Sequence, residues 1–549
     1  MTARLACNGV FVAECWQLFI DDHVIGRSTG LRRVVHHPRP LGVVIDSDQP
    51  WETAGISPIY FGRRTNGEFF CFYSSMWWDI DQASSLPEGF REDRAHHILH
   101  RIGYATSKDG IHWTKPVLNL VEGPAAVDWK RHAPYPSPEK MSKRNNLGVP
   151  FVVVADLGTH GNVTDPAKRF ALRLVPGPDR QAPGVGGAWS EAPEGYFAPE
   201  IPDFLGDADW RDKPEPCGGS FNPRRRLLHF WDGIHNEWVA MDQGVLPNWL
   251  PSREIARFSS KDLKSWESGA VLYPDSGDPN DPESFDEPMS LTPFCAEGLV
   301  FGLLSWFHSD RTYPGGGPDL VPSAEHPHRW PWCRKGTNEM RITISRDGGL
   351  TWDRRSSREA WIPHGPEEDS YDRLVISPVP PLRVGDEDWF YVGVIDGDHL
   401  GIRNDPDSTL YNRGRLSRFR IALYTQKHNR YVSMTARNRW DVLITRPIKV
   451  EGRSLQVNVD AGRGELRIGI ARAEPVPTFD GTTPSHAVHL LERNMLSGFT
   501  FDDCPPIYTN SIEHTVQFLG QPDLRSLAGS EVCLLFKMYN LDLYGFRIL

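Results

Sequence analysis

Ser345-Arg-Asp-Gly-Gly-Leu-Thr-Trp352 is the stretch from which the fold of this chain can be worked out. Related stretches are Ser107-Lys-Asp-Gly-Ile-His-Trp113 and Ser260-Lys-Asp-Leu-Lys-Ser-Trp266. In each, an aspartate follows a serine by two residues, and a tryptophan comes four or five residues later. The pattern is typical of a tight turn between strands, in which the aspartate accepts backbone N–H groups, glycine supplies a positive φ and tryptophan begins the next strand. We call these segments Asp-turns.

Three Asp-turns indicate one structural unit that is repeated around a ring, because each follows a short β-type run. These runs are residues 101–106, 253–259 and 340–344. The first strands of successive units are expected near Ser57, Leu147, Gly219, Met289 and Val375. Steps of about 70–90 residues exceed the ~40–45 residues of a minimal propeller blade, so long loops must be inserted. The sequence therefore predicts a five-bladed β-propeller.

The pattern changes after about Trp440. Short segments that alternate apolar and polar residues follow one another without further Asp-turns, at residues 455–459, 465–471, 514–517 and 532–539. Such spacing is typical of a β-sandwich. The expected fold class is all-β, with a five-bladed β-propeller over residues 1–438 and a C-terminal β-sandwich over residues 439–549.

The composition of the 549 residues agrees with many short strands joined by irregular loops, because the chain has 19 Trp, 26 Phe, 49 Gly and 46 Pro. A net charge of −11 without a basic stripe argues against a nucleic-acid partner. The sequence has no apolar run of 18 residues, so no membrane span is expected. Eight scattered cysteines without a Cys-x-x-Cys pair and a start without signal-peptide order favour a cytoplasmic protein.

Several stretches resemble known carbohydrate-active enzymes. The Asp-turn at Ser345 is similar to the Asp box of sialidases. The whole chain resembles the five-bladed propeller glycoside hydrolases of families 32, 43 and 68, and within them an uncharacterised family-32-like branch. The matching stretches are Leu18-Phe-Ile-Asp-Asp22, Pro50-Trp-Glu52, Asp109-Gly-Ile-His-Trp113, Asn145-Asn146, residues 393–399 and Asp542-Leu-Tyr-Gly-Phe546. The resemblance implies a propeller followed by a sandwich, and a carbohydrate substrate.

The family-32 catalytic motifs do not transfer to this chain. It has no Trp-x-Asn-Asp-Pro-Asn-Gly and no Arg-Asp-Pro, and its Glu14-Cys15 precedes the first blade. Candidate residues therefore come from position, because the ends of the first strands of all blades converge on one pocket. Carboxylates precede three of these strands, at Asp48 and Glu52, at Asp286 and Glu287, and at Asp369 and Asp372.

Glycoside hydrolysis needs one carboxyl group that protonates the leaving oxygen and one carboxylate that activates water or attacks carbon. The predicted catalytic residues are Asp286, Glu287, Asp372, Glu52 and Glu339. Asp286 or Glu287 would be the proton donor, and Glu52 or Asp372 the opposing carboxylate. The predicted substrate-binding residues are Asp48, Trp77, Arg144, Asn145, His308, Asp398 and His399.

Other interpretations stay open at this point. The acidic run at residues 278–287 is also compatible with a solvated loop or a structural Ca²⁺ site, and the tryptophans with core packing. No cofactor and no metal are expected in the predicted site. The leading hypothesis is a glycoside hydrolase acting on a small glycan or glycoside. The alternatives are a non-catalytic carbohydrate-binding propeller, or a lyase or phosphorylase on the same fold, and a homo-oligomer is left open.

Overall fold

The computed structural model describes seventeen segments of the chain. They are residues 15–49, 52, 55–64, 66–78, 98–116, 151–156, 170–174, 195–198, 216–218, 229–244, 254–261, 267–272, 286–309, 336–355, 358–399, 419–473 and 493–549. Strands form almost all regular structure in these segments, and helix is limited to short turns such as the 3₁₀ helix Arg525–Leu527. The predicted all-β class is confirmed. Among the described residues, no helix has the length and apolar character to cross a bilayer.

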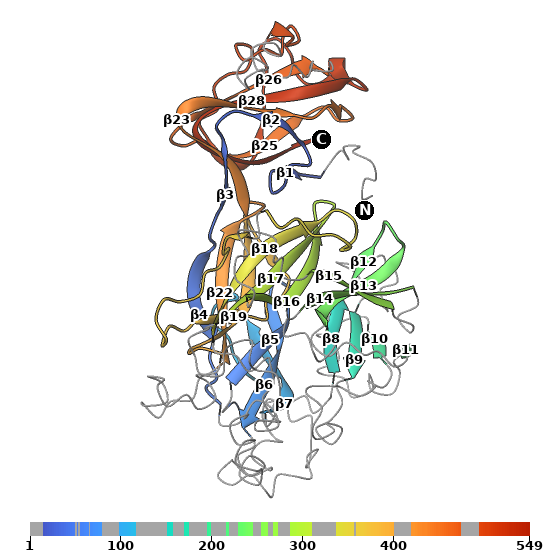
Figure 1. The fold of residues 1–549 in the computed structure, drawn as a ribbon, viewed down its shortest axis with the longest axis vertical. Helices are drawn as coiled ribbons and strands as arrows, with labels where there is room; N and C mark the ends of the chain where they lie inside the picture. Colours follow the sequence, from blue (N-terminus) through green and yellow to red (C-terminus); the bar gives the residue numbers. More distant parts are fainter. Residues whose placement is uncertain are drawn as a thin grey trace, which may run out of the picture.

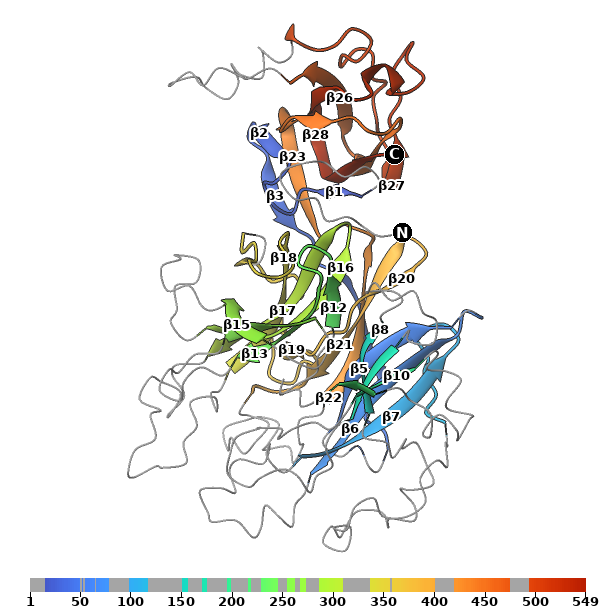
Figure 2. The ribbon, with the colours of Figure 1, turned by 90° about the vertical axis from the view of Figure 1, so that its right-hand side faces the viewer.

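Between residues 39 and 427, the described strands form five antiparallel groups (Figures 1 and 2). The first is β5 (Gly55–Arg63), β6 (Phe69–Trp78) and β7 (Ile98–Ser107). The second is β8 (Phe151–Asp156), β9 (Phe170–Leu174), β10 (Gly195–Ala198) and β11 (Pro216–Gly218). The third is β12 (His229–Asp232), β13 (Glu237–Gly244), β14 (Glu254–Ser260) and β15 (Glu267–Leu272).

The remaining two groups come from residues 287–427. One is β16 (Glu287–Ala296), β17 (Leu299–Ser309) and β18 (Gly336–Ser345). The other is β19 (Leu374–Ile376), β21 (Glu387–Ile395) and β22 (Phe419–Lys427), with β20 (Leu382–Val384) and β4 (Arg39–Ile45) at its sides. Parallel contacts between β18 and β19 and between β22 and β5 join three groups into one 11-stranded sheet. Closure into a five-bladed propeller stays a prediction.

A nine-stranded sheet lies above these groups in Figure 1. It contains β23 (Val432–Thr445), β24 (Ile448–Lys449), β25 (Leu455–Asp460), β26 (Glu465–Arg472), β27 (Asn510–Thr515) and the long β28 (Glu531–Ile548). The N-terminal strands β1 (Gln17–Leu18), β2 (Ile25–Ser28) and β3 (Arg32–Val35) pair with β28 and β23 in this sheet. The division of the chain after residue 438 stays a prediction.

Two Asp-turns are described in full, and they share one set of hydrogen bonds. In the turn at Ser345, Asp347 Oδ1 accepts from Ser345 Oγ at 2.8 Å and from the backbone N–H of Thr351 at 2.8 Å. In the turn at Ser107, Asp109 Oδ1 accepts from Ser107 Oγ at 3.0 Å and from the backbone N–H of His112 at 2.8 Å. Both turns contain glycines with positive φ. Most of the Asp-turn at Ser260 lies outside the described residues.

Each described Asp-turn is bonded to the neighbouring group of strands. The carbonyl of Gly348 accepts from Arg257 Nε of β14 at 2.9 Å, and the equivalent carbonyl of Gly110 accepts from the Tyr391 hydroxyl of β21 at 2.7 Å. The tryptophans of the two turns pack in the same interfaces, Trp352 in a core that it shares with β12–β17 and Trp113 edge-on to Tyr391. The turns therefore connect neighbouring groups of strands as well as neighbouring strands.

We expect Asp347→Ala to destabilise the protein by about 1–2 kcal/mol, because it removes the acceptor of the Ser345 hydroxyl and of the N–H and hydroxyl of Thr351, and water replaces only part of these bonds. The measurement is the shift of the denaturant midpoint followed by tryptophan fluorescence. Leu350→Ala is the matched control, since this side chain of the same turn is 44% exposed and its loss should cost less than ~0.5 kcal/mol. Equal midpoints for the two variants would contradict the structural role of Asp347.

Candidate strand-end site

One row of register partners crosses the three groups of the 11-stranded sheet close to one end of their strands. We call it the strand-end row. It runs through Glu287, Phe307, Asn338, Leu374, Ile395, Phe419, Gly55 and Met76. Asp286, His308 and Glu339 adjoin this row in the sequence, and Glu52, Asp372, Asp398 and His399 lie within four residues of it. Predicted residues from three groups of strands therefore lie along this row, at the same end of the sheet.

A β-bulge lies next to the strand-end row. The register of β16 with β17 shifts between Pro288 and Ser290, directly after Glu287. Proline cannot donate a ladder hydrogen bond, and bulges re-aim neighbouring side chains. The register of β5 with β6 shifts in the same way after Pro58. Proline in these two strands thus alters the backbone close to the predicted carboxylates.

Asp286, His308 and Glu339 form one hydrogen-bonded chain. His308 Nδ1 lies 2.7 Å from Asp286 Oδ2, and its Nε2 lies 3.1 Å from Glu339 Oε2. Arg341 Nε donates to Glu339 Oε1 at 2.6 Å. The side chains at positions 339 and 341 share a face of β18 because side chains alternate along a strand. Three of the predicted residues, from three separate strand ends, are therefore in direct contact.

The charge of His308 follows from these contacts. Burial lowers its pKa, but the hydrogen bonds to Asp286 and Glu339 outweigh burial and raise the pKa to about 9. Burial raises the pKa of Glu339, but the bonds and charges of His308 and Arg341 dominate and the net shift is downward. At neutral pH His308 is therefore a protonated imidazolium, and the Glu339 carboxylate is ionised.

Cation–π contacts hold Arg341, the partner of Glu339, in place. The indole of Trp306 is fully buried, and the guanidinium carbons of Arg341 and Arg354 lie 4.5 and 4.7 Å from its ring centroid. Cation–π contacts of desolvated arginines are worth up to about 2 kcal/mol. Arg341 is thereby held in place to bind Glu339.

Glu52 and Asp48 belong to a second cluster near the same row. The ammonium of Lys115 donates to Glu52 Oε2 at 2.7 Å, to Asp48 Oδ1 at 2.8 Å and to the carbonyl of Asp46 at 2.7 Å. The Tyr73 hydroxyl donates to Glu52 Oε1 at 3.0 Å. Burial raises the pKa of the Glu52 carboxyl above its usual range, against the effect of Lys115. Glu52 is thus a buried, fully bonded group.

Two further predicted carboxylates have arginine or tyrosine partners. Asp398 Oδ1 accepts from Arg373 Nε at 2.7 Å, and Asp372 Oδ2 accepts from the Tyr424 hydroxyl at 3.2 Å. The ring of His399 packs against Phe307, with centroids 5.2 Å apart. Hence Asp398 is bonded to Arg373 just before β19, His399 lies against β17 and β18, where its backbone N–H donates to the Gly336 carbonyl at 2.9 Å, and Asp372 is bonded to Tyr424 of β22.

The other predicted residues are placed only in part. Glu287 is buried, 2% exposed, at the first position of β16. Trp77 is on β6, but its side chain is outside the description, and Arg144 and Asn145 lie outside the described residues. The roles of all these residues stay predictions. Lys115, Arg341 and Arg373 were missed, because nothing in the local sequence marks an arginine or lysine as the partner of a distant carboxylate.

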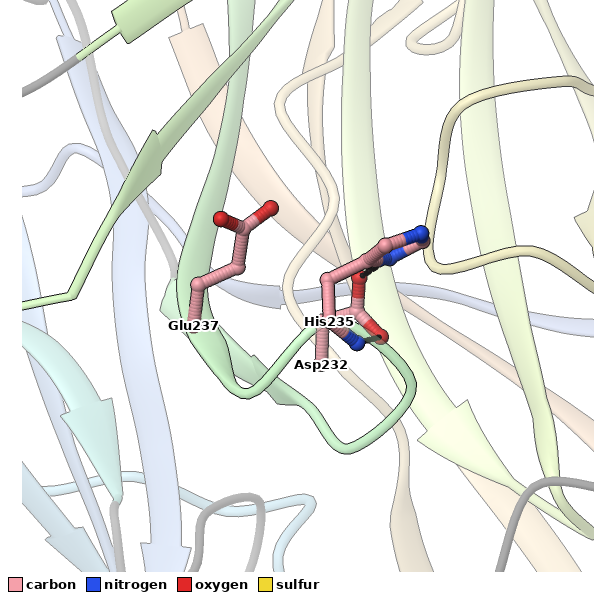
Figure 3. Close-up of side chains that lie close together, drawn as sticks. All are labelled: Asp232, His235 and Glu237. Atoms are coloured by element: carbon pink, nitrogen blue, oxygen red, sulfur yellow. Dashed lines mark hydrogen bonds and ion pairs between the residues drawn. The ribbon is translucent and has the colours of Figure 1, made fainter.

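Another group of side chains that resembles a metal site is explained by an ion pair. Asp232, His235 and Glu237 lie close together on β12, β13 and their turn (Figure 3). A guanidinium nitrogen of Arg257 lies 2.9 Å from Asp232 Oδ2 and 2.8 Å from Glu237 Oε1, so both carboxylates already have a cation. The turn at Asp232 has the same Asp-Gly-Ile-His sequence as the turn at Asp109. In both, histidine Nδ1 lies close to aspartate Oδ2, at 2.6 Å for His235 and Asp232 and at 2.7 Å for His112 and Asp109.

Comparisons with known proteins give weak likenesses. No family model and no curated protein matches the chain. Similar solved structures include a glycosyl hydrolase from Bacteroides ovatus, with 11% identity, a TM-score of 0.37 and coverage of 72% of this chain and 94% of that one. A beta-1,2-mannobiose phosphorylase from Listeria innocua has 12% identity, a TM-score of 0.35 and coverage of 72% and 90%. An N-acetylgalactosamine deacetylase from F. plautii has 12% identity, a TM-score of 0.33 and coverage of 73% of this chain and 97% of that one. TM-scores this low assign neither a fold nor an activity.

The pKa of His308 can be tested directly. Because its folded pKa of about 9 exceeds the ordinary 6.5, its stabilising contribution is present below pH 6.5 and is lost as pH rises through 9. NMR titration of histidine-labelled protein should show one imidazole titrating near pH 9 that disappears in His308→Gln. Glu339→Gln should lower that pKa. An imidazole at position 308 that titrates at or below pH 6.5 would refute the chain of contacts.

The buried Lys115–Glu52 pair gives a second test. Lys115→Met should destabilise the protein by about 3–5 kcal/mol, because it leaves the buried Glu52 carboxylate without its cation. Adding Glu52→Gln should restore much of this loss in denaturant unfolding. A single variant as stable as the wild type, or a double variant no better than Lys115→Met, would show that the pair is not coupled.

Proposed function

We propose that this chain cleaves the glycosidic bond of a small glycan or glycoside at the strand-end row. The observation that carries the proposal is the Asp286–His308–Glu339 chain, in which two carboxylates from separate strand ends are held on one imidazolium. Glu339 is kept ionised by His308 and Arg341, which suits a carboxylate that activates water or stabilises positive charge at the anomeric carbon. Glu287 is the proton donor to the leaving oxygen, because Asp286 is held as a carboxylate on the His308 imidazolium.

His308 acts as a positioning residue in this proposal. Its two nitrogens fix one oxygen of Asp286 and one of Glu339, so neither carboxylate can rotate freely toward the other. The imidazole ring and two hydrogen bonds, of 2.7 and 3.1 Å, separate the carboxylates. The ring fills the space between these two carboxylates, so the glycosidic bond would lie beside the pair and their spacing does not select inversion or retention. NMR of a fresh reaction identifies the anomeric configuration of the first product.

The test of the proposal is turnover on a panel of aryl glycosides and short oligosaccharides, with and without inorganic phosphate. On the best substrate, Glu287→Gln and Glu339→Gln should each lower kcat by about 10²–10⁴-fold, the usual contribution of acid–base groups. Glu513→Gln is the matched control, since this carboxylate is half exposed in the C-terminal sheet. Full activity in Asp286→Asn, Glu287→Gln and Glu339→Gln would refute the assignment.

The panel also separates the proposal from its alternatives. Turnover only in the presence of phosphate would identify a phosphorylase, and an unsaturated product that absorbs ultraviolet light would identify a lyase. Saturable binding without turnover on any substrate would identify a carbohydrate-binding protein. Each of these outcomes would overturn hydrolysis.

A further inference from the structure

Three aromatic side chains on the C-terminal sheet are exposed to an unusual degree. Trp440 is 45% exposed, Tyr539 38% and Tyr508 59%. Large aromatic side chains are normally buried because each removes 150–250 Å² of surface from water. Exposure of three of them on one sheet therefore needs a reason.

Strand pairing places these rings side by side. Trp440 of β23 and Glu465 of β26 both pair with Tyr539 of β28, so the three residues form a row across three adjacent strands. The rings of Trp440 and Tyr539 are 5.4 Å apart and inclined by 38°. The Tyr508 hydroxyl donates to Glu465 Oε2 at 3.0 Å and extends the row. We call these four residues the aromatic row.

A bulge presents Trp440 to solvent. The register of β23 with β28 shifts between Ala436 and Trp440, and Asn438 within the bulge has a φ of 55°. Residues 437–440 are exposed, whereas the strand on either side is buried. Bulges are a means of re-aiming a side chain, often beside a functional site. The outward position of Trp440 is thus built into the backbone.

Charged groups stand between and beside the rings. Lys537 Nζ lies 5.3 Å from the Trp440 ring centroid, and Arg467 Nε donates to Glu465 Oε1 at 2.6 Å. Protein–protein interfaces are enriched in Trp, Tyr and Arg and depleted of Lys and Glu, so composition alone does not separate a protein partner from a small ligand here. Rings accompanied by a few fixed donors and acceptors suit a ligand with apolar faces and polar edges. A sugar ring has C–H faces and hydroxyl edges.

We infer that the aromatic row is a binding site for a neutral oligosaccharide, separate from the strand-end row. The ligand stacks on Trp440 and Tyr539, and its hydroxyls bond to Glu465, Lys537 and Arg467. The span of three strands at ~4.8 Å spacing is ~10 Å, which accommodates a short oligosaccharide. The carboxylate of Glu465 offsets one of the two positive charges of Arg467 and Lys537, so these three groups carry a net charge of only one, which suits an uncharged ligand.

Affinity electrophoresis tests this site with the full chain. Native gels contain β-mannan, arabinoxylan, mixed-linkage β-glucan or levan, and retardation of the wild type by at least one of them is expected. Trp440→Ala and Tyr539→Ala should weaken the affinity tenfold or more, and Trp440→Phe less. Leu350→Ala removes an exposed apolar side chain elsewhere and should change nothing. Glu339→Gln should keep the retardation, because the strand-end row is not involved.

Three outcomes would overturn the inference. They are a wild type that no gel retards, retardation that survives both alanine variants, and loss of self-association in Trp440→Ala at unchanged retardation. The last would assign the aromatic row to contacts between copies of the chain. Because binding is measured without turnover, the inference holds or fails independently of the proposed hydrolysis.

Discussion

The arrangement of the strands depends on a single type of contact, the bond from a neighbouring group of strands to the glycine carbonyl of an Asp-turn. Arg257 makes it to Gly348, and Tyr391 makes it to Gly110. A carbonyl at a buried corner must find a donor, since an unpaired one would cost about 1–3 kcal/mol. The aspartate accepts from the N–H groups of the turn. Arg257 is a donor to the Gly348 carbonyl, and the Gly110 carbonyl accepts from Tyr391 and also from Trp113 Nε1 of its own turn at 3.0 Å. The same turn thus folds its own strands and fixes their neighbours.

Fixed neighbours explain why a site can form at the strand ends. Only single pairs of residues, Asn338 with Leu374 and Phe419 with Gly55, join the groups of the large sheet in parallel. Such sparse contacts cannot position side chains by themselves. The packing of tryptophan and tyrosine between groups supplies the rigidity that places Glu52, Asp398 and His399 near the row. Asp286, His308 and Glu339 lie within hydrogen-bonding distance because β16, β17 and β18 pair directly within one group.

The features that could be predicted from the sequence are those determined by residues close together in the chain. The Asp-turn is closed by atoms within seven residues, so its hydrogen bonds can be inferred from the motif, and strand starts identify residues near the row. Partners remote in the sequence could not be inferred. Lys115 binds Glu52 across 63 residues, and β1 pairs with β28 from the other end of the chain. The Asp232 turn was missed because it lacks the serine of the Asp-turn.

A second carboxylate–histidine–carboxylate chain shows that such a chain alone does not make a site. His428 Nδ1 lies 2.9 Å from Asp388 Oδ1, and its Nε2 lies 3.6 Å from Glu297 Oε1. Burial raises the pKa of Asp388 to about 6. However, Asp388 lies near the start of β21 and Glu297 directly follows β16, so this chain lies at the strand ends opposite to the strand-end row. The backbone carbonyl of His428 accepts from Asn458 of the C-terminal sheet at 2.9 Å. The chemistry of the two chains is similar, and it is the position beside the strand-end row, near Glu52, Asp398 and His399, that makes Asp286–His308–Glu339 the candidate for catalysis.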